Sequence, residues 1–169
     1  MDMAESIILD RPTAEKKLKR LAMEVIERHT GSGEIILIGI RKNGFPIARK
    51  IGSLLETGHG GGIRVVALSI DKRHPAGIRL EPEVSCSGKT VILIDDVANS
   101  GRTMLYALSP LLEAYPARIE TLALVARTHR SFPVALDYVG LSVSTRPAEH
   151  IRVDVVNDEV TGAVIENIG

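Results

Sequence analysis

The sequence predicts an α/β fold with a mainly parallel central sheet flanked by helices. Continuous apolar runs, as at Ile35–Ile40 and Val91–Ile94, are typical of parallel strands that are covered on both faces. Segments with apolar residues at helical spacing alternate with these runs, as expected where helices connect neighbouring parallel strands. Neither an internal repeat nor a linker interrupts the pattern, so residues 1–169 are expected to form a single domain.

The first half of the chain is predicted to hold, in order, an edge strand at Glu5–Leu9, a helix at Thr13–His29, a strand at Ile35–Ile40, a helix from about Pro46 and a strand at Arg64–Ile70. Thr13 is the expected N-cap of the first helix and Gly31 its expected stop, because a hydroxyl accepts a free N–H group and glycine suits a left-handed C-cap. The glycine-rich run at 58–62 is predicted to be a turn rather than a phosphate cradle, since no helix follows it.

Residues 71–89 are expected to form an irregular loop, because proline and glycine recur there. The second half is then predicted to hold a strand at Val91–Ile94, a helix from Met104 to about Tyr115, and strands at Ile119–Ala126, Tyr138–Val143, Ile151–Val155 and Val160–Ile165.

Composition and charge narrow the functional classes. Hydrophobic residues make up 44% of the chain and charged residues 25%, as in globular proteins, and the net charge is zero. A neutral chain weighs against a dedicated nucleic-acid binder, although it does not exclude a local basic patch. No apolar run approaches the length of a membrane span and no charged-then-apolar leader opens the sequence, so we expect neither a membrane partner nor a signal peptide. The single Cys86 cannot form an internal disulfide and the histidines lack metal-ligand spacing, so we expect a cytoplasmic protein without its own metal site.

The most informative motif joins two adjacent carboxylates, Asp95 and Asp96, to a short polar loop at the end of a predicted strand. The loop places free N–H groups and two hydroxyls at a helix N-terminus, where an anion binds favourably; its residues are Ala98, Asn99, Ser100, Gly101, Arg102 and Thr103. The carboxylates would repel a bare phosphate, but they accept hydrogen bonds from a diol and bind hard cations. The motif therefore predicts a ligand such as a ribose 5-phosphate. It is neither a Walker A loop nor a dinucleotide fingerprint, and the alternative is an ordinary strand–turn–helix connection.

A second strand-to-helix turn carries two cations between small or polar residues: Arg41, Lys42, Asn43 and Gly44. Free N–H groups beside two cations suit a polyanion such as pyrophosphate. Basic loop residues usually face solvent, so this motif is weak when taken alone. Its interpretation as part of a site depends on the carboxylate motif downstream.

Together these residues resemble the signature of type I phosphoribosyltransferases, which bind phosphoribosyl pyrophosphate (PRPP). The resemblance implies that Asp95 and Asp96 are the catalytic pair at the ribose, that residues 98–103 hold the 5-phosphate and that residues 41–44 receive the pyrophosphate. It also implies Mg²⁺ as a cofactor carried on PRPP, with no metal ion bound directly by the protein.

Over nearly the whole chain the sequence is similar to the PyrR family, whose members are pyrimidine-operon RNA attenuators that often also act as uracil phosphoribosyltransferases. The similarity is carried by runs such as Ile-Leu-Ile-Gly-Ile40, Leu-Val-Ala-Arg-Thr-His-Arg130 and Leu-Asp-Tyr-Val-Gly140. It implies a type I fold with a small base-binding hood, assembled as a homodimer or homotetramer. It also implies that the nucleobase lies near Arg127, Tyr138 and Val139. Core packing of Tyr138 and Val139 in a late strand is the alternative, and the two roles can coexist.

Two departures from the family pattern bear on function. The loop at 71–89 is shorter than the family's corresponding arm and has Ile-Asp-Lys-Arg-His74 in place of Tyr-Arg-Asp-Asp. Because that arm shields the reacting centre from water, ligand binding is expected to be better preserved than catalysis. Family members also bind RNA through a basic surface, and Met23 stands where their pattern has a polar residue. The candidates for such a surface are Lys19, Arg20, Arg28, His129 and Arg146.

The expected function is transfer of a phosphoribosyl group from Mg²⁺–PRPP to a nucleobase, uracil in the first place, with release of pyrophosphate. The main alternative is a nucleotide-sensing regulator that binds a pyrimidine mRNA leader with weak or no catalysis. A transferase for a purine base is a further alternative, because base choice depends on backbone edges and loop shape.

Overall fold

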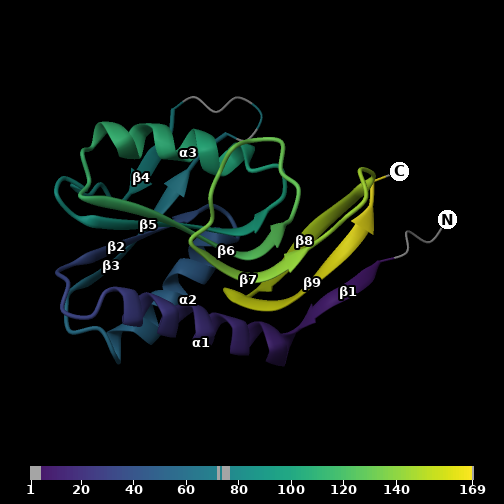
Figure 1. Cartoon of the computed structure of the whole chain (residues 1–169), viewed down its shortest axis with the longest axis horizontal. Helices are drawn as coiled ribbons and strands as arrows, with labels where there is room; N and C mark the ends of the chain where they lie inside the picture. The colour runs from purple at the N-terminus through teal and green to yellow at the C-terminus, as the bar shows by residue number, and fades with distance from the viewer. Residues whose placement is uncertain (1–4, 72, 74–76, 169) are drawn as a thin grey trace.

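The computed structural model describes residues 5–71, 73 and 77–168, and the chain folds into two sheets with helices packed around the larger one (Figure 1). The expected α/β fold with a mainly parallel central sheet is confirmed. The strands of the larger sheet are β2 (Ile35–Ile40), β3 (Ile63–Ser69), β4 (Arg79–Glu81), β5 (Thr90–Ala98), β6 (Arg118–Arg127) and β7 (Tyr138–Val143).

Within the described residues this sheet has six strands in the order β4-β3-β2-β5-β6-β7. Five of them run parallel, and β4 pairs antiparallel with β3 at one edge. Strands β2 and β5 are direct neighbours, with Ile38 opposite Leu93 and Gly39 opposite Ile94. Because parallel neighbours end at the same edge of a sheet, the loops that follow β2 and β5 lie side by side.

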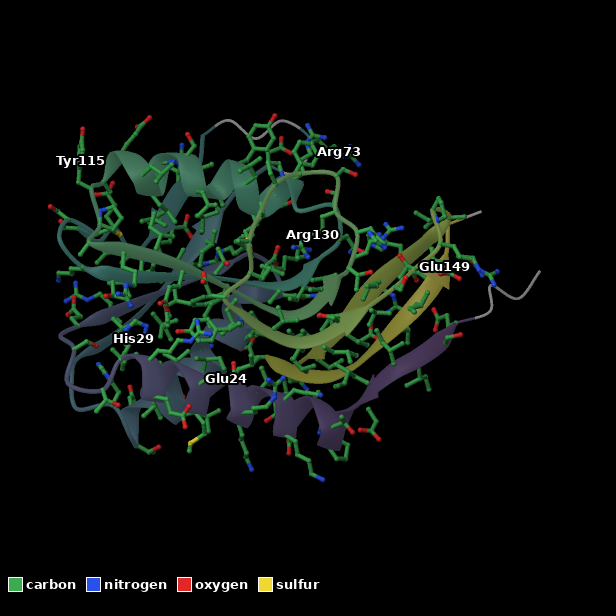
Figure 2. All side chains as sticks on the ribbon, viewed as in Figure 1. Glu24, His29, Arg73, Tyr115, Arg130 and Glu149 are labelled. Atoms are coloured by element: carbon green, nitrogen blue, oxygen red, sulfur yellow. The ribbon has the colours of Figure 1, made fainter. Side chains whose placement is uncertain are left out.

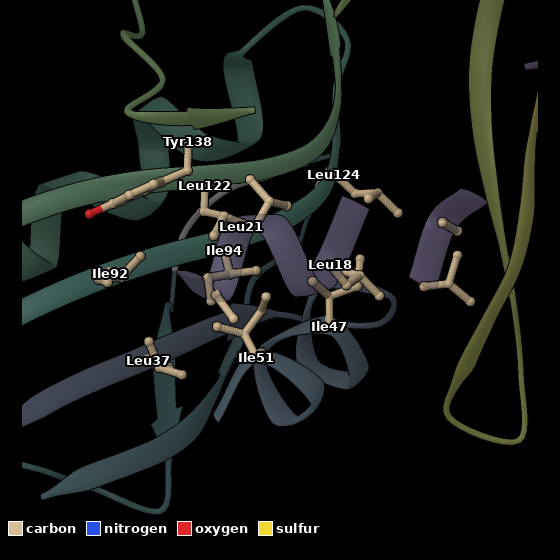
Figure 3. Close-up of a cluster of buried hydrophobic side chains, with 14 of the residues drawn as sticks. Leu18, Leu21, Leu37, Ile47, Ile51, Ile92, Ile94, Leu122, Leu124 and Tyr138 are labelled. Atoms are coloured by element: carbon tan, nitrogen blue, oxygen red, sulfur yellow. The ribbon is translucent and has the colours of Figure 1, made fainter. Parts of the chain in front are cut away.

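Helices cover both faces of the sheet. On one face, α1 (Arg11–Arg28) and α2 (Gly44–Glu56) pack on alternate residues of β2, β5 and β6, and α3 (Arg102–Glu113) covers the opposite face. Figure 3 shows the first cluster, in which Leu21 of α1 and Ile51 of α2 meet Ile94 of β5. Each of these side chains is fully buried, which contributes roughly 1.5–3 kcal/mol apiece.

The remaining strands form a small antiparallel sheet, which we call the hood: β1 (Ser6–Asp10), β9 (Glu159–Asn167) and β8 (Glu149–Val156), with β9 in the middle. The first and last described segments of the chain are therefore neighbours in this sheet (Figure 1). The family resemblance implied a small hood beside the central sheet, and this three-stranded sheet lies outside the larger one as that expectation requires.

Three local predictions need correction. Asp10, not Thr13, is the N-cap of α1, because its Oδ1 accepts the N–H of Thr13 at 2.9 Å. The stretch at 71–89 is not wholly irregular, since it contains β4; Lys72 and residues 74–76 lie outside the described residues. Strand β5 continues to Ala98, so both aspartates lie on the strand rather than after it. Among the described helices, none is long and apolar enough to cross a membrane.

Candidate functional site

Asp95 and Asp96 lie near the carboxyl end of β5 and occupy different surroundings, because successive side chains of a strand point to opposite faces. Asp95 is buried, with 4% of its surface exposed, and its Oδ1 accepts the N–H of Asp96 at 2.9 Å. Asp96 is half-buried and lines a cavity of about 550 Å³. The second carboxylate of the pair is therefore the one in position to meet a ligand in this cavity.

Residues 98–103, which we call the phosphate loop, run from the end of β5 through the turn into the first residues of α3 and line a small concavity of about 30 Å³. Gly101 adopts a left-handed conformation with φ +82°, which a residue with a Cβ adopts only at a cost, and a Cβ there would lie 3.2 Å from the Phe132 carbonyl oxygen. The Oγ of Ser100 accepts the N–H of Arg102 at 3.2 Å. The N-terminus of α3 lies at this concavity, and the first N–H groups of a helix have no partner within the helix and favour an anion.

Residues 41–44, which we call the basic loop, connect β2 to the first residue of α2 and form another wall of the cavity of about 550 Å³. Arg41, Lys42 and Asn43 line the cavity together with Asp96. Gly44 lets the loop approach β5, because a Cβ on it would lie 2.7 Å from the Ile94 carbonyl oxygen.

The side chains of the basic loop have different partners. Lys42 is exposed, whereas Arg41 pairs with Glu81 of β4 at 3.2 Å and lies over the Phe45 ring. Both partners of this ion pair are about half exposed, so a bound anion can displace Glu81 at little cost. The Nδ2 of Asn43 donates to Asp96 Oδ2 at 3.1 Å, which joins the basic loop to the strand that carries the carboxylates.

Comparisons with known proteins identify the family of the chain. Residues 5–158 match the phosphoribosyl transferase domain family. The protein named Bifunctional protein PyrR of Pelotomaculum thermopropionicum is 35% identical over 156 residues, which cover 86% of each chain. Its namesake from Roseiflexus sp. is 37% identical over 175 residues and 96% of each chain.

The chain belongs to the PyrR family. The solved structures similar to this PyrR family member share its fold. The hypoxanthine phosphoribosyltransferase of Trypanosoma cruzi superposes with a TM-score of 0.80 at 17% identity over 99% of both chains. The hypoxanthine-guanine phosphoribosyltransferase of Bacillus anthracis gives a TM-score of 0.73 at 20% identity over the whole of both chains. The chain therefore has the type I phosphoribosyltransferase fold.

In this PyrR family member, the side chain of Tyr138 is a core residue, and a contact between the base and the backbone of this segment stays a prediction. Tyr138 is completely buried and packs in the core cluster, as Figure 3 shows. Its hydroxyl donates to Glu120 Oε2 at 2.6 Å and lies 3.4 Å from His29 Nε2, and the Arg28 guanidinium lies 4.5 Å from its ring centre. Burial, followed by the hydrogen bond to Glu120, raises the pKa of Tyr138 above its ordinary range.

The carbonyl group of Val139 is also engaged elsewhere. It accepts a hydrogen bond from Arg20 Nη2 at 3.0 Å, and the same nitrogen donates to the Gly140 carbonyl oxygen at 2.8 Å. Arg20 thus fastens α1 to the outer edge of β7. The alternative interpretation of Tyr138 and Val139 as packing residues of a late strand fits these contacts.

The other predicted residues divide between two regions of the PyrR fold. Lys19, Arg20 and Arg28 are exposed on α1, while His129 and Arg146 are exposed on the loops after β6 and β7. Arg127 is half-buried at the end of β6 and donates to the Arg146 carbonyl oxygen at 2.8 Å. Figure 2 shows this separation through two labelled neighbours, His29 at the end of α1 and Arg130 on the loop after β6.

Sequence reasoning missed several residues around the cavity. Ser69, the last residue of β3, and Ile70 after it line the cavity, and backbone groups of Ile151 and Val153 in the hood bond to the two loops. Ser69 and Ile70 could have been predicted, because β3 is a parallel neighbour of β2 and ends at the same edge of the sheet. No local signal marks the second pair, because these contacts join residues that lie far apart in the chain.

Proposed function

We propose that this protein transfers a phosphoribosyl group from Mg²⁺–PRPP to a nucleobase, with uracil as the acceptor. The observation that carries the proposal is the convergence of two loops suited to anions on adjacent strand ends, with Asp96 beside the basic loop. PRPP has a phosphate at one end of its ribose and a pyrophosphate at the other, so it requires two anion sites with diol acceptors near them. Uracil is proposed from the family resemblance.

The phosphate loop would hold the 5-phosphate by N–H groups at the start of α3, assisted by the Ser100 and Thr103 hydroxyls. The N–H of Arg102 would exchange its bond to Ser100 Oγ for one to a phosphate oxygen. The Asn99 side chain is bound to the hood instead, so that residue would contribute its backbone only.

Arg41 and Lys42 would take the pyrophosphate, with Mg²⁺ entering as part of the substrate. A ring nitrogen of the base would bond to C1 of the ribose as the C1–oxygen bond breaks. The electron pair of that bond would leave on the pyrophosphate, and the proton of the base nitrogen would pass to the pyrophosphate or to solvent. Asp96 would accept a hydrogen bond from a ribose hydroxyl and stabilise positive charge on the ring.

The first experiment is pyrophosphate release from Mg²⁺–PRPP with uracil, cytosine, hypoxanthine, guanine and adenine offered separately. Release with uracil alone is the expected result. Release with a purine alone would replace uracil by that base and keep the transferase. No release with any base, together with PRPP binding by calorimetry, would overturn catalysis and favour the regulator.

Replacing both Arg41 and Lys42 by alanine is expected to weaken PRPP binding by roughly tenfold or more, because two cations facing the pyrophosphate are lost. Binding of uridine monophosphate, which has no pyrophosphate, should change by less than about threefold. Calorimetry on both ligands measures the difference. Equal losses for the two ligands would show that the basic loop does not serve the pyrophosphate. Arg49→Ala is a matched control, because this exposed cation on α2 pairs with Asp158 rather than lining the large cavity.

We also propose binding of a pyrimidine mRNA leader as a second candidate function, supported by the word bifunctional in the names of the relatives. Lys19 is exposed on α1, but Arg20 and Arg28 are engaged with β7. Because cations that contact RNA phosphates release counterions, the affinity for a leader RNA should fall steeply as the salt concentration rises. Lys19→Ala should weaken the binding. RNA binding that does not exceed that of an unrelated RNA of equal length would remove this candidate.

A further inference from the structure

Two asparagine side chains join the hood to the ligand loops. Asn99 of the phosphate loop donates from Nδ2 to the Ile151 carbonyl oxygen at 3.1 Å, and its Oδ1 accepts the N–H of Ile151 at 3.3 Å. Asn43 of the basic loop donates from Nδ2 to the Val153 carbonyl oxygen at 3.1 Å. Ile151 and Val153 are alternate residues of β8, so these backbone groups point to the same side of the strand.

These bonds complete an open strand edge. Among the described strands, β8 pairs only with β9, so backbone groups on its other side have no partner in a described strand. Ile151 and Val153 are buried, with 1% and 2% of their surfaces exposed, so their backbone groups need partners from the protein. In this contact the Asn99 side chain uses one N–H donor and its carbonyl oxygen, as the backbone of a neighbouring strand would.

Both asparagines also belong to the loops that would bind PRPP. Asn99 directly precedes Ser100, and a phosphate that draws the Arg102 N–H away from Ser100 Oγ would shift the backbone next to Asn99. The Nδ2 of Asn43 donates to Asp96 as well as to Val153, so a ribose hydroxyl at Asp96 would compete within that contact. Ligand binding at either loop is thus linked by one side chain to β8.

We propose, resting on the function proposed above, that Asn99 and Asn43 are positioning residues that couple occupancy of the PRPP loops to the placement of β8. PRPP on the two loops fixes the hood strand and, with it, the shape of the site that the nucleobase enters. Neither asparagine takes part in making or breaking bonds. Loss of Asn99 leaves PRPP binding in place but disconnects the hood from it.

Hydrogen exchange of the β8 amides tests this coupling. Mg²⁺–PRPP is expected to slow exchange in residues 149–156 of the wild-type protein by roughly tenfold and to leave it nearly unchanged in Asn99→Ala. Thr161→Ala is the matched control, because it removes a side-chain hydrogen bond to the Asp154 carbonyl oxygen within the hood and contacts neither loop. Asn99→Asp, which keeps the acceptor and loses the donor, serves as the second variant if the alanine variant does not fold.

Kinetics supply the second readout. Asn99→Ala should raise KM for the nucleobase by roughly tenfold while Kd for PRPP stays within about twofold, whereas a general loss of structure would weaken both. A wild-type protein that binds no PRPP by calorimetry overturns the proposed function and the coupling with it. PRPP binding without slower exchange in β8, or with an equal response in Asn99→Ala, overturns the coupling alone.

Discussion

Replacing Asp96 by asparagine is expected to lower turnover of Mg²⁺–PRPP and nucleobase by roughly tenfold or more. Asparagine keeps the shape of the side chain and removes its charge. A hydrogen bond to a charged group is worth about 1.5–3 kcal/mol, and each 1.4 kcal/mol lost from the transition state is about tenfold in rate. Asp96 lines the cavity of about 550 Å³, whereas Asp95 is buried and lines the concavity at the phosphate loop, so Asp96 is the carboxylate proposed to meet the ribose.

The Asp96 prediction is measured by pyrophosphate release, with urea unfolding to show that the fold is intact. Asp158→Asn provides the control, because this exposed aspartate pairs with Arg49 and does not line the large cavity. It loses a carboxylate of the same kind and should keep the wild-type rate. An unchanged rate in Asp96→Asn would remove the carboxylate from the proposed mechanism.

Replacing Glu120 by alanine is expected to lower the free energy of unfolding by about 3–5 kcal/mol, a large part of a typical total of about 5–15 kcal/mol. Glu120 is 7% exposed, accepts the Tyr138 hydroxyl at 2.6 Å and lies 2.8 Å from His29 Nε2. Its removal leaves two buried polar groups without this partner. Urea unfolding measures the loss, and a change below about 1 kcal/mol would contradict it.

Two variants calibrate the Glu120 result. Tyr138→Phe removes one hydroxyl and should cost only about 1–2 kcal/mol, with no change in KM for the base. Glu24→Ala breaks an exposed pair with Arg20 and should cost about 0.5 kcal/mol or less. A raised KM for the nucleobase in Tyr138→Phe would show that the Tyr138 side chain contributes to base binding.

The same cluster contributes to the pH dependence of stability. Burial by itself would raise the pKa of Glu120, but hydrogen bonds from Tyr138 and His29 outweigh it and hold the pKa below its ordinary value. A carboxyl group with a lowered pKa in the folded state stabilises the protein above its unfolded pKa and loses that contribution as the pH falls. The unfolding free energy of the wild type should therefore drop more steeply below about pH 5 than that of Glu120→Gln.

The sequence determined the features that depend on neighbours along the chain. The unbroken apolar run at Ile35–Ile40 is a central strand with the predicted bounds, and the motif around Asp95 and Asp96 lies at a strand end before a helix. Strand alternation, helical spacing and the preference of glycine for a left-handed turn act over a few residues, so local patterns record them. The family resemblance likewise depends on contiguous motifs.

Only the tertiary structure decided which distant groups meet. Tyr138 was assigned to the base, yet its hydroxyl is taken by Glu120 and His29, which come from β6 and the end of α1. Asn99 was assigned to the phosphate, yet its side chain is taken by Ile151, which lies 52 residues further along the chain. A polar side chain has the same local pattern whether it meets ligand, water or a buried backbone group. Its partner is set by the packing of whole sheets and helices, which no short stretch of sequence contains.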